Sequence, residues 1–61
     1  PQTRVYTHEE KKAMVEWKFA ALLSISHHEP AVQEIIRTLE DDGLIERYMN
    51  EYFDHLRQQD R

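Results

Sequence analysis

The chain has 61 residues, enough for one small domain, and it contains no cysteine, which excludes disulfides and thiolate metal sites. Hydrophobic residues make up 39% and charged residues 33% of the chain, a balance too apolar for a typical disordered tail. The net charge is −4, divided as +1 over residues 1–28 and −5 over residues 29–61, so the second half opposes contact with nucleic-acid phosphates and anionic membranes.

The first predicted element is a helix that follows an extended N-terminal arm, residues 1–6. Thr7 and Glu10 have the spacing of a capping box, in which the Thr7 hydroxyl accepts from the Glu10 amide and the Glu10 carboxylate accepts from the Thr7 amide. Up to Lys18, the polar and apolar residues that follow separate tolerably around the helix axis. We therefore expect a single helix over about 8–24, with Trp17 as an anchor in the core.

The second predicted helix lies between a proline and the only glycine of the chain. Pro30 disfavours helical geometry at the residue before it and is at home in a first helical turn. The apolar positions have the spacing of a single helical stripe: Val32, Ile35, Ile36 and Leu39. Gly43 stands where a helix needs a left-handed residue to stop, and Leu39 and Leu44 fall at the pair that makes contact in a Schellman motif. The pattern predicts a helix over 30–42.

The third predicted helix follows this turn. Its apolar residues recur every four positions: Leu44-Ile45, Tyr48-Met49, Tyr52-Phe53 and Leu56. A strand would alternate every two residues, so the spacing favours a helix over about 45–58. We thus expect an all-α, three-helix domain spanning residues 7–61.

Two of these helices carry more apolar surface than two neighbours can easily cover. Around the axis of the first helix, the residues from Phe19 to Leu23 point in nearly every direction, and a helix that is apolar all round is normally buried all round. A large exposed apolar patch usually marks an interface, although a compact monomer with some exposed leucine and tyrosine is the alternative. We therefore predict a helical homodimer or a stable hetero-complex. The expected interface residues are Phe19, Leu22, Leu23, Tyr48, Tyr52 and Phe53.

Acidic side chains gather around the turn between the second and third helices. We expect four of them to form a surface that suits a basic protein partner. These residues are Glu40, Asp41, Asp42 and Glu46.

The candidate chemical groups do not form a complete catalytic or metal-binding set. His27, His28 and Glu29 resemble a metal cluster, but adjacent side chains point in different directions and zinc needs three or four converging ligands. A pH response of these histidines stays open. A single glycine excludes a glycine-rich phosphate loop, and no hydroxyl has an evident base with an orienting third group. We expect no catalytic residue, no metal and no cofactor, and therefore no enzyme.

Residues 31–47 resemble the end of a helix-turn-helix in winged-helix regulators, which often place L-E-x-x-G-L-I-x-R between the recognition helix and the first wing strand. In this chain those letters run from Leu39 to Arg47. The resemblance implies that the helix over 30–42 enters the major groove of DNA. The helical periodicity after Arg47 and the acidic residues of that helix oppose this, because phosphates require basic side chains.

Together these observations predict a non-enzymatic protein–protein interaction module that serves regulation or assembly. It would self-associate through apolar helix faces and present an acidic surface to a protein partner. A degenerate helix-turn-helix domain is the alternative, although we do not expect this chain alone to bind nucleic acid. No apolar run approaches the roughly 18 residues of a membrane span, and we expect a cytoplasmic protein without membrane contact.

Overall fold

The computed structural model describes residues 5–24 and 29–59, and every regular element in those ranges is helical. The helices are α1 (His8–Lys18), α2 (Ala20–Leu23), α3 (Glu29–Asp41) and α4 (Ile45–Gln59). The all-helical prediction is confirmed, and α3 and α4 begin and end within one residue of their predicted bounds. His27 and His28 lie outside the described residues.

The beginning of α1 matches the predicted capping box. The Thr7 amide donates to the Glu10 carboxylate at 2.9 Å, and the Glu10 amide donates to the Thr7 hydroxyl at 3.1 Å. Two backbone donors that have no partner inside the helix are thereby satisfied. A local sequence signal is therefore enough to fix where α1 begins.

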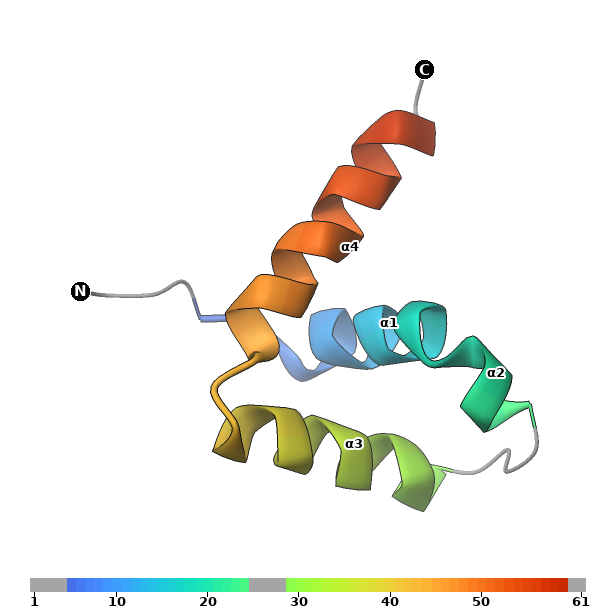
Figure 1. Ribbon diagram of the computed structural model, residues 1–61, viewed down its shortest axis with the longest axis vertical. Helices are drawn as coiled ribbons and strands as arrows, with labels where there is room; N and C mark the ends of the chain where they lie inside the picture. The colour runs from blue at the N-terminus through green and yellow to red at the C-terminus, as the bar shows by residue number, and fades with distance from the viewer. Residues whose placement is uncertain (1–4, 25–28, 60–61) are drawn as a thin grey trace.

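The prediction of one helix over 8–24 is not confirmed, because the chain leaves helical geometry at Phe19, with φ −114° and ψ 33°. The described residues therefore contain four helices, not three. The ring of Phe19 packs edge-on against Tyr48 of α4, with 6.2 Å between centroids. Leu23, at the end of α2, packs against the core. A straight continuation of α1 would carry Leu23 away from the body of the molecule, whereas the bend turns α2 toward α3 (Figure 1).

The end of α3 is a complete Schellman motif. Gly43 has φ 71°, the left-handed conformation that favours glycine. Its amide donates to the Glu40 carbonyl at 3.2 Å, and the Leu44 amide donates to the Leu39 carbonyl at 2.9 Å. Leu39 is buried and Leu44 packs against the core that contains it, as the predicted turn requires.

The helices form a thin layer in which α1 lies between α3 and α4 (Figure 1). The molecule measures 32 × 32 × 16 Å, so its thickness is not far above the diameter of about 10–12 Å of one helix with its side chains. α3 and α4 meet at the turn that joins them and diverge from there (Figure 1). The domain therefore has two broad faces and little interior.

The core runs along the middle of this layer. Met14 and Val15 of α1 and Met49 of α4 are fully buried. The arm before α1 and one face of α3 complete the buried set: Tyr6, Val32, Ile36 and Leu39. No residue of α2 is buried. The hydrophobic stabilisation of the fold therefore comes from α1, α3 and α4, while α2 contributes mainly surface.

Candidate protein-interaction surface

The short helix α2 carries an exposed apolar surface. Ala20, Ala21 and Leu22 are all exposed, and 63% of Leu22 is accessible to solvent. We refer to these three residues as the α2 patch. No residue of α2 is charged, so nothing in this helix opposes desolvation of the patch.

The predicted interface residues differ in how much of each is exposed to solvent. Leu22 is exposed, whereas the other five are half-buried and pack against the core: Phe19, Leu23, Tyr48, Tyr52 and Phe53. The aromatic members contact rings of their own chain. Tyr52 lies 5.7 Å from Trp17 and 5.9 Å from Phe53, and Phe53 lies 6.2 Å from Tyr6, centroid to centroid. These rings mainly join α4 to α1 and to the arm before α1.

Two further apolar side chains are exposed outside the predicted set. Val5, in the arm before α1, is 85% accessible, and Leu56, near the end of α4, is 40% accessible. Leu56 continues the stripe of α4 that buries Met49 two turns earlier. The exposure of Leu56 could not be predicted from periodicity, because the spacing of α4 assigns Leu56 to the same stripe as Met49.

The four predicted acidic residues lie around the turn from α3 to α4, and all of them are exposed. We refer to Glu40, Asp41, Asp42 and Glu46 as the acidic corner. The Lys11 ammonium contacts the Glu40 carboxylate at 2.6 Å, which offsets one charge. The last turn of α3 has no basic residue, although the negative end of a helix dipole favours cations there. The acidic corner is thus placed against the local electrostatic preference of α3.

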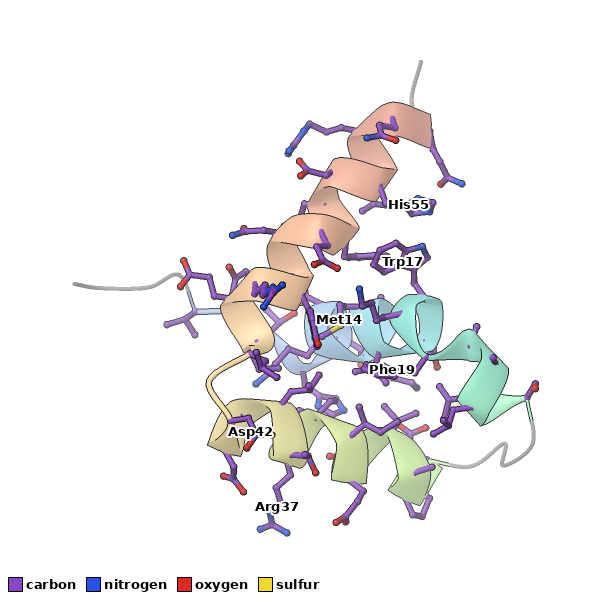
Figure 2. All side chains as sticks on the ribbon, viewed as in Figure 1. Met14, Trp17, Phe19, Arg37, Asp42 and His55 are labelled. Carbon is purple, nitrogen blue, oxygen red and sulfur yellow. The ribbon has the colours of Figure 1, made fainter. Side chains whose placement is uncertain are left out.

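The α2 patch and the acidic corner lie at opposite ends of α3. Asp42 lies at the end of α3 that leads into α4, and α2 lies beside the end where α3 begins (Figures 1 and 2). The 13 residues of α3 span about 20 Å at 1.5 Å per residue. A partner on one surface would therefore leave the other accessible.

Ion pairs join α1 to both ends of α3. Besides the contact of Lys11 with Glu40, the Lys12 ammonium lies 3.3 Å from the Glu29 carboxylate. The hydrogen bond that the Lys12 ammonium donates to the Glu29 carboxylate, and then the negative charge of Glu29, raise the pKa of Lys12 above its usual 10.5. Both pairs are accessible to solvent, so each is worth little as a source of stability.

Trp17 is not the core anchor that the sequence suggested. The positions of α1 that are buried are Met14 and Val15, whereas Trp17 is half-buried at the edge of the α1–α4 contact. Its ring stacks on His55, with 4.9 Å between centroids and 25° between planes. The predicted and observed positions of Trp17 differ because α3 and α4 together decide which side of α1 is buried.

Within the described ranges, no three side chains of the metal-binding types converge on one point. Of the helices described, none combines the length and the apolar character that a bilayer crossing requires. Comparison with protein-family models, with curated proteins and with solved structures gives no match. Function must therefore be argued from the two exposed surfaces and their chemistry.

Proposed function

We propose that the chain is a protein–protein interaction module, without catalytic activity of its own, that self-associates through the α2 patch. The observation that carries the proposal is Leu22, a large aliphatic side chain that is 63% accessible on an uncharged helix. Covering one such side chain stabilises a complex by up to about 1.5–3 kcal/mol. The proposal includes an intracellular location, because the absence of cysteine suits a reducing compartment.

The dimensions of the layer allow an interface of adequate size. A stable complex buries about 800 Å² per partner, which is more than a four-residue helix offers. One broad face of this molecule extends over 32 × 32 Å, so a copy seated on α2 can also cover neighbouring parts of α1 and α3. The association cost of roughly 4–15 kcal/mol requires such an extended contact, of which Leu22 would be one part.

Charge favours a second copy at α2 over a second copy at the acidic corner. The chain carries a net charge of −4, and two acidic corners brought together would repel each other. The uncharged α2 patch has no such repulsion. Because α2 and the acidic corner lie at opposite ends of α3 (Figure 1), a dimer joined at α2 keeps both acidic corners accessible.

The acidic corner is the part of the proposal that concerns a second partner. Asp41, Asp42 and Glu46 are exposed, and the C-terminal end of α3 adds the partial negative charge of its dipole. A basic protein surface would relieve this unfavourable placement and suits the corner best. The module would then join copies of itself at one end and dock a basic protein at the other.

Self-association is tested by sedimentation equilibrium at micromolar concentration. We expect the natural chain to have about twice the 7.4 kDa mass of one copy. Leu22→Glu should reduce the mass to that of the monomer, because association through the α2 patch would have to desolvate the new charge. Leu56→Glu is the matched control, since Leu56 is also exposed but lies on α4, and it should remain dimeric. A monomeric natural chain, or equal dissociation in both variants, contradicts the proposal.

The basic partner is tested by fluorescence anisotropy with a labelled oligolysine peptide as the probe. Asp42→Asn combined with Glu46→Gln should weaken binding. The control combines Glu16→Gln with Glu34→Gln, which changes the net charge equally at exposed positions outside the corner. Equal weakening in both double variants would mean that only total charge matters, and the acidic corner would then have no specific role.

A duplex of random DNA sequence serves as the third probe. We expect no binding at about 50 mM salt, because the chain carries a net charge of −4 and phosphate contacts need cationic side chains. In the helix-turn-helix alternative, α3 would be the recognition helix. It exposes Glu34 and Asp41 beside Arg37, and no strand follows it in the described ranges. Binding that falls steeply with added salt would instead favour the helix-turn-helix alternative.

A further inference from the structure

A stacked pair of rings joins the end of α1 to the C-terminal part of α4. Trp17 and His55 come from these two helices and lie side by side (Figure 2). Both side chains are half-buried, whereas every described residue after His55 is exposed. Within the described ranges this stack is therefore the last ring contact that α4 makes along its length.

The two rings make this contact sensitive to protonation. The face of an indole is the best aromatic surface for a cation, and histidine is the side chain whose charge ordinarily changes between pH 5 and 8. A protonated imidazole above Trp17 gains an electrostatic attraction that the neutral ring lacks. His55 also lies one turn before the last residue of α4, Gln59, where a positive charge suits the negative end of the helix dipole.

The charged neighbours of the stack come from both helices, and most of them are paired. On α1, the Lys18 ammonium lies 5.8 Å from the Trp17 ring centroid and forms an ion pair with Glu51 of α4. On α4, Asp54 forms an ion pair with Arg57. Both of these cations, Lys18 and Arg57, thus have a carboxylate beside them.

The remaining neighbours do not reverse this balance. Glu16 precedes Trp17 on α1 and is exposed, and its negative charge does not oppose a proton on His55. α2 carries no charge. The ring contact and the helix dipole therefore decide the sign of the effect.

We infer that the Trp17–His55 stack is a protonation-sensitive clasp, which holds the end of α4 against α1 more tightly in mild acid than at neutral pH. At neutral pH the contact is an ordinary stack of two uncharged rings, and the end of α4, with the exposed Leu56, is held less firmly. The clasp would let pH adjust how the end of α4 is presented. It does not depend on the proposed self-association.

The single tryptophan of the chain makes the clasp directly observable. A protonated imidazole in contact with an indole quenches its emission, so Trp17 fluorescence should fall sigmoidally as the pH is lowered through the histidine range. His55→Gln should abolish this step, whereas His8→Gln should preserve it, because His8 contacts Gln33 on the α1–α3 side. A step that survives in His55→Gln, or that disappears in His8→Gln, overturns the inference.

Urea unfolding at about pH 5.5 and about pH 7.5 provides the second readout. Lowering the pH should decrease the unfolding equilibrium constant of the natural chain by about two- to five-fold more than that of His55→Phe. His55→Phe keeps an aromatic ring on Trp17 but cannot titrate, so it separates the proton from the packing. Identical pH dependence in the two proteins, or destabilisation of the natural chain in acid relative to the variant, contradicts the clasp. Both pH values are measured at a concentration where sedimentation shows one species.

Discussion

The turn at Gly43 and the break at Phe19 both interrupt helical geometry, and they do so by different means. At Gly43 the chain adopts φ 71° and its neighbouring amides return to the carbonyls of α3. At Phe19 the angles of φ −114° and ψ 33° are open to any residue, and no side chain caps the start of α2. The Phe19 ring meets Tyr48 on another helix, and we expect this contact to favour the break.

We expect the path of the chain to be set by neighbouring residues at Gly43 and by tertiary contacts at Phe19. The turn at Gly43 would be favoured in any protein that placed the same few residues at the end of a helix. We expect the break at Phe19 only where the fold offers its side chain a place to pack. Substitutions at the two positions should therefore fail in different ways.

The largest effect is expected for Phe19→Ala. Loss of the half-buried ring should lower the free energy of unfolding by about 2 kcal/mol and should also remove the reason for the break. Urea unfolding measures the first effect, and backbone chemical shifts of residues 18–20 moving to helical values would report the second.

Leu22→Ala is the control for this substitution. Because Leu22 is exposed in the monomer, its truncation should change stability by no more than about 0.5 kcal/mol at concentrations where the chain does not associate. If both variants lose the same free energy, the Phe19 contact is not what distinguishes the two positions.

A smaller loss, of about 1–2 kcal/mol, is expected for Gly43→Ala, because an L-residue is unfavourable in the left-handed conformation. An added Cβ would meet no heavy atom within 4 Å, so the cost is conformational and not steric. Gly43→Asn should cost less than Gly43→Ala, since asparagine tolerates this conformation better. Unfolding midpoints that rank the two variants in the opposite order would contradict a purely local mechanism.

The smallest effect concerns the exposed pair of Lys12 and Glu29. Glu29 raises the pKa of Lys12 above 10.5, so the pair stabilises the folded state fully below that pH and loses its contribution as the pH rises through the folded-state value. The stability difference between the natural chain and Glu29→Gln should therefore be smaller at about pH 11 than at about pH 8. A difference that grows with alkaline pH would reverse the sign of this linkage.

The parts of the fold that could be predicted are those with local causes. Thr7 and Glu10 fix the start of α1, and Gly43 fixes the end of α3, through contacts within a few residues. At the break, the Phe19 ring contacts Tyr48, which is 29 positions away in the chain. The same limitation placed Trp17 in the core, because the periodicity of α1 does not show how α3 and α4 divide its faces.

For the predicted interface residues, too, features with a local cause could be predicted and features with a distant cause could not. The exposure of Leu22 agrees with the expectation from a segment that is apolar on every side, since no single neighbour can cover such a helix. Tyr52 and Phe53 were predicted as interface residues. Their rings contact Trp17 and Tyr6 of the same chain. Whether an aromatic residue serves the core or a partner depends on distant residues and is not encoded in helical spacing.

A layer 16 Å thick also affects how freely such a sequence can change over evolutionary time. Only a few side chains, such as Met14 and Met49, have neighbours on every side, and methionine is an adaptable residue that other apolar side chains can replace. Most remaining positions are constrained by helix formation or charge alone. Sequences that share this architecture could therefore diverge until little visible similarity remains, while the path of the backbone is preserved.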